Sequence, residues 1–392
     1  MLSPELSKVI DDTVDQERVA LAKLSSDIHA NPELRFEEHK AAGWIAELLR
    51  ARGYEVEQGI AGLPTALRAR KGNADGPKVA ILGEYDALPE IGHACGHNLI
   101  AASAVGAFLA AAAVAHHTQG EIVFLGTPAE EGGGGKIKMI QAGVFEGLDA
   151  AMMFHPFDRD MLAHTALASM WLAMTFKGAP AHAAAAPHDG KSALQACMDT
   201  FRLIDGQQVR FRDGVRVHGY VTNGGQAVNI IPELAACEFS VRARDTVELA
   251  RVRGIVERCA QAAALASEVT VEIVVREGYR DMRNNMTMAR AFGEHLGSLG
   301  RKARETDDRV GAGSTDMGDV SHVVPSIHPY LAIVDENVAL CHQHAFAGAA
   351  ASDRGFDTTV HAAKALARTA VELLVDDQLR SSVRAEWSAE KT

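Results

Sequence analysis

The chain has 392 residues, too many for one ordinary hydrophobic core, so its length predicts two domains or one large domain with an insertion. Its composition is globular, with 47% hydrophobic and 23% charged residues, which argues against long disordered segments. The net charge of −12 and the lack of a basic run argue against nucleic acid as the main partner.

Five cysteines are scattered along the chain, and their odd number favours a reducing compartment without a disulfide framework. The N-terminal segment is charged and amphipathic, unlike a signal peptide. The most apolar stretch, 99–115, is shorter than a membrane span of about twenty residues and is followed by two histidines. We therefore expect a cytoplasmic protein, with no membrane partner, in which this stretch is a buried helix.

The first part of the chain predicts alternating helices and strands. Residues 5–50 have apolar positions at spacings of three and four, which indicates helices that end near Gly53. Strands are predicted within 56–70 and at 79–85, 121–127 and 150–155. The last three are separated by the Ala-rich helix at 99–115 and by a helix near 136–142. Apolar strands alternating with helices indicate a largely parallel sheet with helices on both faces.

From about residue 168 the pattern becomes β-α-β-β-α-β, the order of a split-βαβ unit of the ferredoxin-like type. The predicted strands are 169–178, 215–225, 231–244 and 269–278, and the predicted helices are 192–208 and 247–267. The strands alternate polar and apolar residues, as expected if one face is open. We therefore predict an α/β catalytic domain with a mixed, mainly parallel sheet over 1–167 and 278–392, and an inserted α+β domain over 168–277.

The segment GEYDALPEIGHACGHN, residues 83–98, directly follows an apolar strand. Its polar side chains are therefore expected at the carboxyl edge of the sheet, where open α/β folds bind ligands. Cys95 and His97 are close enough in sequence to share one metal ion where the chain turns, and Asp86 adds a carboxylate near the strand end. The alternative is a glycine-rich turn with an incidental cysteine and histidine.

A second apolar strand is followed by GTPAEEGGGGK, residues 126–136. Adjacent Glu130 and Glu131 point in different directions in an extended chain, so one can bind metal while the other acts as a general base. Glycines 132–135 allow the backbone to approach a ligand closely. GGGGK lacks the spacing and the trailing Ser/Thr of a phosphate-binding P-loop. The remaining alternative is a surface turn with two solvated glutamates.

Histidines occur at two further strand ends. His155 is predicted to end the strand at 150–155, and His342 and His344 follow an apolar run in ENVALCHQHAF. Each histidine alone is explained by packing or exposure. Four strand-end clusters of metal-competent residues nevertheless indicate one shared site, and Cys, His and carboxylate together suit zinc or a similar divalent ion.

These motifs, together with GAPAHAAAAPHDGKSAL, NIIPE and GSTDMGDVS, resemble the aminoacylase and glutamate-carboxypeptidase family of metallopeptidases. CGHN with PAEE resembles its amidohydrolase branch, which includes hydrolases of auxin conjugates, aminobenzoyl-glutamate and dipeptides. The motifs occur in order from about residue 20 to 375. The resemblance implies metal-dependent cleavage of a C–N amide bond in a small N-acyl amino acid, aryl-amide or dipeptide.

The resemblance also implies that one or two divalent ions, Mn²⁺ or Zn²⁺, are held by Cys95, His97, Glu131, His155 and His342. It implies that Glu130 is the general base and that Asp86 is the carboxylate beside the metal site. The wider family has a ligating histidine where this chain has Glu84, which makes Cys95 the substitute ligand. His342 is preferred because it lies four residues before Phe346, with His344 as the alternative.

The remaining implied site residues lie outside these clusters. The resemblance implies that His182 acts from the lid domain of a partner subunit and stabilises the oxyanion, in a homodimer formed through the inserted domain. The alternative for His182 is a histidine in a surface turn. Asn229 and the run Ser314, Thr315 and Asp316 resemble positions around the substrate. Two rival functions are a hydrolase with Cys95 as nucleophile and a catalytically silent binding protein on the same fold.

Overall fold

The computed structural model describes residues 2–307 and 313–389, and the chain forms two compact units. The first unit is Met1–Thr165, Met282–Ala312 and Asp316–Thr392, and the second is Ala166–Asp281 with Gly313–Thr315. The second unit thus begins at 166 where 168 was predicted and ends at 281 where 277 was predicted. It also takes in three residues, 313–315, that the sequence assigned to the first domain.

The first unit is built on a six-stranded sheet in the order β1-β2-β4-β3-β5-β11. Its strands are β1 (Val56–Gln58), β2 (Leu67–Gly72), β3 (Lys78–Gly83), β4 (Glu121–Gly126), β5 (Ala150–Met152) and β11 (Ser326–Ile327). Strands β3, β4, β5 and β11 run parallel to one another. At one edge, β2 pairs antiparallel with β4 on one side and with β1 on the other. The prediction of a mixed, mainly parallel sheet is confirmed.

The single strand predicted within 56–70 is a hairpin of β1 and β2. Gly59 has a φ of +81°, and the short 3-10 turn Ile60–Gly62 follows it, so the chain reverses before β2 begins. Positive φ values are accessible to glycine at little cost, which explains the reversal at this position.

The strand predicted at 150–155 is also divided. β5 ends at Met152, and β6 (His155–Phe157) pairs in parallel with β12 (Tyr330–Ala332) in a separate two-stranded sheet. His155 therefore begins β6 and does not end β5, as the sequence had suggested. The physical reason is the partner segment, because Pro329 has no N–H with which to continue the ladder from β11.

Helices of the first unit cover both faces of its sheet. They are α1 (Pro4–Ala30), α2 (His39–Ala51), α3 (His97–Ala113), α4 (Gly135–Gln141), α7 (Met286–Ser298), α8 (Met317–Ser321), α9 (His344–Ala350), α10 (Asp353–Val375) and α11 (Asp377–Ala389). The β3-α3-β4 and β4-α4-β5 connections run in opposite directions along the sheet, so right-handed crossovers place α3 and α4 on opposite faces.

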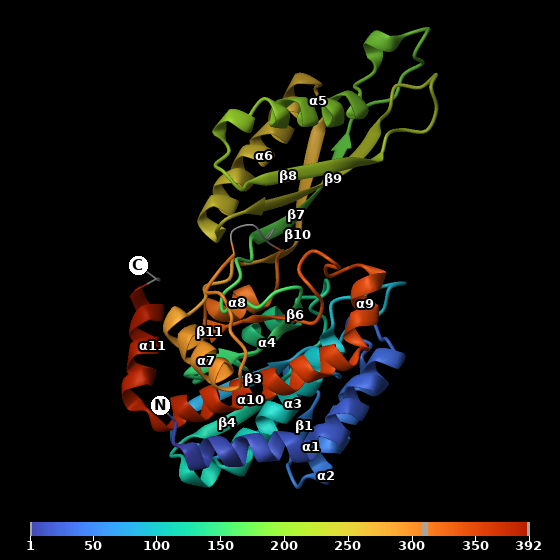
Figure 1. The fold of residues 1–392 in the computed structure, drawn as a ribbon. Helices are drawn as coiled ribbons and strands as arrows, with labels where there is room; N and C mark the ends of the chain where they lie inside the picture. The colour runs from blue at the N-terminus through green and yellow to red at the C-terminus, as the bar shows by residue number, and fades with distance from the viewer. Residues whose placement is uncertain (1, 308–312, 390–392) are drawn as a thin grey trace. The chain divides into compact units, whose positions relative to one another are not determined.

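The Ala-rich α3 is the buried helix that the sequence predicted, and it packs against α1 and α10 (Figure 1). Small residues allow this close approach. A Cβ at Gly106 would lie only 2.8 Å from Cδ1 of Leu21 on α1. Within the described part of the chain, no helix combines the length and the apolar character needed to cross a bilayer.

The second unit has the predicted β-α-β-β-α-β order. Its elements are β7 (Ala168–Lys177), α5 (Ala193–Asp205), β8 (Arg216–Asn223), β9 (Leu234–Ala243), α6 (Thr246–Ala266) and β10 (Thr270–Tyr279). The four strands form an antiparallel sheet in the order β10-β7-β9-β8. Every second residue of β9 is buried against a separate hydrophobic core that α5 and α6 complete, which is the alternation expected of a sheet with one open face.

Candidate active site

Two parallel strands bring the first two motifs to one edge of the sheet. Gly83 at the end of β3 lies opposite Gly126 at the end of β4. The segments with Asp86 and with Glu130 therefore leave the sheet at the same level. This juxtaposition follows from the in-register parallel pairing and positions the rest of the site.

The Cys95–His97 turn leads into α3, and glycine is required at its centre. Gly96 has a φ of +78°, and a Cβ there would lie 2.7 Å from Cγ of Pro156. Candidate ligand atoms of Cys95, His97 and Glu131 all lie within 4.8 Å of one another. The turn is therefore part of a cluster and is not an incidental glycine-rich loop.

Asp86 orients the imidazole of His97. Nδ1 of His97 lies 2.9 Å from the carbonyl oxygen of Asp86 and 3.0 Å from its Oδ1. Because a carbonyl oxygen can only accept, Nδ1 carries a hydrogen and the lone pair of neutral His97 is on Nε2. Oδ2 of Asp86 accepts a hydrogen bond of 2.9 Å from the backbone N–H of Glu131. One carboxylate thus holds both clusters together.

Glu130 and Glu131 lie in the loop between β4 and α4 with side chains that are 10% and 9% exposed. Oε2 of Glu130 is 4.0 Å and Oε1 of Glu131 is 3.9 Å from Nε2 of His97. This burial excludes the alternative of two solvated glutamates.

The glycine run after the glutamate pair packs against the protein's own chain, contrary to the expectation that it approaches a ligand. A Cβ at Gly135 would lie 1.8 Å from the carbonyl oxygen of Pro128, and one at Gly133 would lie 2.5 Å from the ring of Phe36. The glycines therefore allow the loop that carries the glutamates to fold tightly.

Glu38, at the start of α2, anchors the same loop. Its Oε1 accepts hydrogen bonds from the N–H groups of Phe36 at 2.8 Å and Ala129 at 2.9 Å, and its Oε2 accepts from Thr65 Oγ1 at 3.0 Å. Burial and then the nearby Asp86 carboxylate raise the pKa of Glu38 to about 7.

This pKa predicts a pH-dependent stability. The folded pKa of Glu38 exceeds the unfolded value of about 4.3, so the folded protein favours the protonated carboxyl group. The stability that this group contributes is therefore present at low pH and is lost as the pH rises from about 4.5 to 7. Between pH 5 and 7.5, the free energy of unfolding of the wild type should fall by about 2–3 kcal/mol relative to Glu38→Gln. Urea denaturation of both proteins at the two pH values measures this difference, and parallel pH profiles would contradict it.

His155 is held beside Cys95 by its neighbours. Its Nδ1 lies 2.6 Å from the carbonyl oxygen of Pro156 and so carries a hydrogen, which leaves Nε2 only 3.4 Å from Sγ of Cys95. The imidazole stacks on the ring of Tyr330, with centroids 4.9 Å apart and an interplanar angle of 16°. His97 and His155 thus have the same arrangement, with Nδ1 donating to the protein and Nε2 directed at the cluster.

Of the two C-terminal histidines, His342 contacts the cluster. Its Nε2 lies 3.4 Å from Oε2 of Glu131, and its backbone N–H donates to the carbonyl oxygen of Ala94 at 2.9 Å. His344 is exposed and begins α9. The geometry therefore favours His342 over His344.

The cluster fits a divalent cation. Among the described residues, Nε2 of His97 and Oε1 of Glu131 are buried without a hydrogen-bond partner. Two ligands about 2.0–2.2 Å from one tetrahedral zinc ion lie roughly 3.3–3.6 Å apart, so their 3.9 Å separation requires only a small adjustment. Buried orphan atoms of this kind are costly unless a ligand satisfies them.

The electrostatics of the cluster lead to the same conclusion. Burial lowers the pKa of His97, but Asp86 and other carboxylates outweigh it, and the net pKa lies well above 6.5. Burial and then the charge of Glu131 raise the pKa of Glu130 well above 4.5. Both shifts reflect a surplus of negative charge in a buried space, which a bound cation would neutralise.

A second acidic group already contains its own cation. Carboxylate oxygens of Glu84, Glu130 and Asp316 lie within 4.8 Å of one another. The fully buried ammonium of Lys136 is 2.7 Å from Oδ1 of Asp316 and is hydrogen-bonded to Glu84. We therefore assign no metal ion to this group.

The other predicted residues lie in the second unit. Nδ1 of the exposed His182 accepts hydrogen bonds from the N–H groups of Ala184 at 3.3 Å and Ala185 at 3.2 Å. Asn229 is exposed, and its carbonyl oxygen accepts from the N–H of Ala183 at 3.0 Å.

The run that begins at Ser314 is tied to the strands of the second unit. Ser314 Oγ donates to the carbonyl oxygen of Leu167 at 2.8 Å and accepts from Arg242 at 3.0 Å. The next residue, Thr315, is buried.

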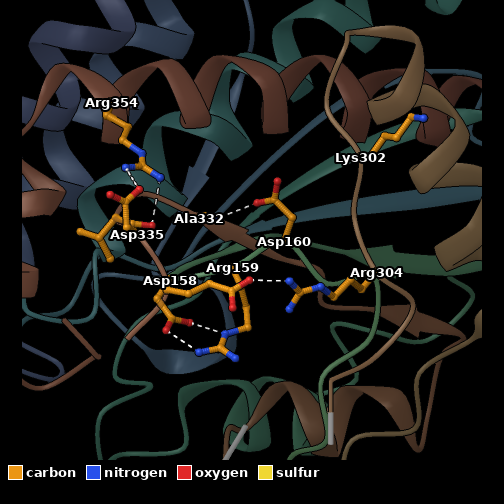
Figure 2. Close-up of a pocket in the computed structure, with 10 residues that line it drawn as sticks. Asp158, Arg159, Asp160, Lys302, Arg304, Ala332, Asp335 and Arg354 are labelled. Carbon is orange, nitrogen blue, oxygen red and sulfur yellow. Dashed lines mark hydrogen bonds and ion pairs between the residues drawn. The ribbon is translucent and has the colours of Figure 1, made fainter. Parts of the chain in front are cut away.

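A hollow of about 260 Å³ on the first unit has none of the predicted residues in its lining. Figure 2 shows arginines and carboxylates that face each other across it. Arg159 pairs with Asp158, and Arg354 pairs with Asp335, each at 2.7 Å. Because these charges neutralise one another, the hollow offers no unbalanced charge for an ionic substrate.

Three residues at the site were not predicted from the sequence: Glu38, Lys136 and Cys341, whose sulfur lies within 4.8 Å of Sγ of Cys95 and of a ring nitrogen of His155. Lys136 closes the glycine run, and Cys341 directly precedes His342, so their positions beside two motifs were available signals. Glu38 is 91 residues from the loop that it anchors, and its local sequence carried no such signal.

The chain matches the model of peptidase family M20/M25/M40 over residues 80–365. It is 38% identical to the Xaa-Arg dipeptidase of Mus musculus, over 96% of this chain and 90% of that protein. It is 33% identical to a subunit of the p-aminobenzoyl-glutamate hydrolase of Escherichia coli, over 76% of this chain and 66% of that protein. A dinuclear metal binding peptidase of the M20 family from Bacillus subtilis has a similar fold, with a TM-score of 0.71 at 22% identity, over 92% of this chain and 99% of that chain.

The matched region contains every motif of the metal-competent cluster, from Asp86 to His342. The identity to named hydrolases extends over nearly the whole chain. These matches confirm the resemblance drawn from the motifs. The chain belongs to peptidase family M20/M25/M40, within its amidohydrolase branch, and is a hydrolase of peptide and amide bonds.

Proposed function

We propose that the protein is a metal-dependent amidohydrolase that cleaves a small dipeptide, N-acyl amino acid or aryl-amide. The observation that carries this proposal is that His97 Nε2 and Glu131 Oε1 are buried and make no hydrogen bond. The ligand set comprises Cys95, His97, Glu131, His155 and His342, and it holds one or two Zn²⁺ or Mn²⁺ ions. When bound, the ion polarises the scissile carbonyl and lowers the pKa of water toward neutrality.

Glu130 acts as the general base and then as the general acid. Its carboxylate lies within 4.0 Å of Nε2 of His97 but is not needed for the ligand set. It takes a proton from the attacking water and returns it to the leaving amine.

His182 stabilises the oxyanion from the second unit of a partner subunit, in a homodimer. Because its Nδ1 accepts two backbone hydrogen bonds, the hydrogen of neutral His182 is on Nε2, which can donate to developing negative charge. Asn229, on the neighbouring segment, and the Ser314-Thr315 pair are proposed to lie near the substrate. The five cysteines are free thiols, which supports a reducing, cytoplasmic location.

Among the substrate classes, the identity of 38% to an Xaa-Arg dipeptidase favours dipeptides. Purified protein should be assayed on dipeptides with C-terminal Arg, Lys and neutral residues, on p-aminobenzoyl-glutamate and on N-acyl amino acids. We expect hydrolysis that a chelator abolishes and that Zn²⁺ or Mn²⁺ restores. Hydrolysis that persists in chelator would favour the cysteine-nucleophile alternative, and no hydrolysis of any class would favour the silent binding protein.

Cys95→Ala tests the proposed thiolate ligand. Removing a shared ligand should lower the bound metal, measured by elemental analysis after dialysis, by at least about half, since ligand loss weakens such sites by tenfold or more. Cys259→Ala, at a cysteine of equal 7% exposure in the second unit, is the matched control. Unchanged metal content in Cys95→Ala would remove Cys95 from the ligand set.

A further inference from the structure

Cys341 lies next to the proposed metal site, although it was not among the ligands predicted from the motifs. Its Sγ, Sγ of Cys95 and a ring nitrogen of His155 all lie within 4.8 Å of one another. The separation of Cys95 Sγ from His155 Nε2 is 3.4 Å. Within residues 2–307 and 313–389, two triplets of donors thus share Cys95, one with His97 and Glu131 and one with His155 and Cys341.

The position of Cys341 is fixed from both sides. The following residue, His342, donates its backbone N–H to Ala94 at 2.9 Å, which ties this segment to the Cys95 turn. Cys341 itself packs against the apolar group formed by Phe157, Met161 and Tyr330, on which the ring of His155 also stacks. These contacts hold its sulfur beside the cluster, so the proximity does not depend on an exposed, rotating side chain.

The donor types of the second triplet differ from those of the first. Two thiols and one imidazole are soft ligands, whereas Mn²⁺ prefers carboxylate and water oxygens. Cys₂His sites with an open fourth position are a known form of catalytic zinc site. Each thiol releases one proton to solvent as it binds a divalent ion, so no oxidant or reductant is involved.

We propose that Cys341 is a further metal ligand, which binds one ion together with Cys95 and His155 and makes this position selective for zinc over manganese. The inference rests on the proposed metal-dependent function and adds a ligand to it. In a simpler arrangement, Cys341 is only a hydrogen-bonded neighbour of Cys95 and leaves the metal unchanged.

Cobalt is a suitable probe, because thiolate–Co²⁺ bonds give a charge-transfer absorption that increases with the number of thiolates. Metal-free wild type and Cys341→Ser would each be titrated with one equivalent of Co²⁺. We expect the band of Cys341→Ser to have about half the wild-type intensity at equal bound cobalt. Cys259→Ser should leave the band unchanged. A wild-type intensity in Cys341→Ser overturns the proposal.

A second measurement uses the wild-type chain and does not depend on the folding of a variant. Zinc X-ray absorption of protein with one equivalent of Zn²⁺ distinguishes sulfur at about 2.3 Å from nitrogen and oxygen at about 2.0–2.2 Å. Two sulfur neighbours support the proposal, and one or none overturns it. If one sulfur is found, Cys95 remains a ligand and the proposed function stands. If none is found, the ligand role of Cys95 in that function fails as well.

Cys341 should also determine the preference of the site for zinc over manganese. In competition between Zn²⁺ and Mn²⁺, Cys341→Ser should lower the ratio of zinc to manganese affinity by at least about tenfold, the lower range for changes around metal ligands. An unchanged ratio would contradict the selectivity that Cys341 is proposed to confer.

Discussion

Replacement of Glu130 by Gln should lower kcat at least about a hundredfold and leave the bound metal unchanged. The amide of Gln preserves the size of the side chain but cannot take a proton from water. Steady-state kinetics on the best substrate of the panel, with elemental analysis of the same samples, measures both quantities. Near-normal turnover in Glu130→Gln would exclude Glu130 as the base.

The adjacent residue supplies a sharp contrast. Glu131→Gln should reduce metal content as well as rate, because Oε1 of Glu131 is one of the buried atoms proposed to meet the ion. Glu146→Gln, at an exposed position, should change neither quantity. If the two neighbouring variants behave alike, the division of roles between them is wrong.

The Lys136→Met variant should lose about 3–5 kcal/mol of unfolding free energy, the typical cost of breaking a buried ion pair from one side. Lys136 is fully buried between Glu84 and Asp316, and its backbone N–H also donates to Asp316 at 3.0 Å. Without the ammonium, two buried carboxylates lose the cation that lies between them. Methionine fills a similar volume, so a cavity contributes little to the expected loss.

The pH dependence of this loss identifies its electrostatic origin. Burial, outweighing the opposing effect of Lys136, already raises the pKa of Asp316 to about 6. In Lys136→Met that pKa should rise further, so the deficit should shrink below pH 6, where the carboxyl group is protonated, and be largest near pH 8. Urea denaturation of wild type and Lys136→Met, below pH 6 and near pH 8, measures this difference in unfolding free energy.

Lys138→Met is the matched control, on the same helix but with an exposed ammonium that lies 4.4 Å from the centroid of the Phe36 ring. It should cost at most about 1 kcal/mol. A loss in Lys136→Met that is no greater than in this control would show that the buried lysine does not stabilise the fold.

The positions of the metal-competent residues were predictable because each motif directly follows an apolar segment. Strands that are buried on both faces are apolar throughout, so the first polar residue after each one marks the edge of the sheet. Asp86 and Glu130 were assigned to that edge on this basis, and the in-register pairing of Gly83 with Gly126 confirms that they leave it at the same level.

Failures of prediction occurred where long-range pairing overrides local pattern. The strand that was predicted to end at His155 gives no local sign that its pairing with segment 326–332 is interrupted after Met152 and resumes at His155. That interruption depends on Pro329, about 170 residues further along the chain. The close packing of glycines 133 and 135 likewise depends on partners that local sequence does not identify.

The sequence by itself determined the mixed α/β architecture, the β-α-β-β-α-β order of the second unit and the metal-competent motifs, because hydrophobic periodicity and residue chemistry are local properties. Only the tertiary structure decided that Lys136 neutralises Glu84 and Asp316 across 52 and 180 residues, and that the sulfur of Cys341 lies beside that of Cys95. Ion pairs and shared metal ligands form only between side chains that lie close together in space. A chain of this length brings such residues together only through the fold.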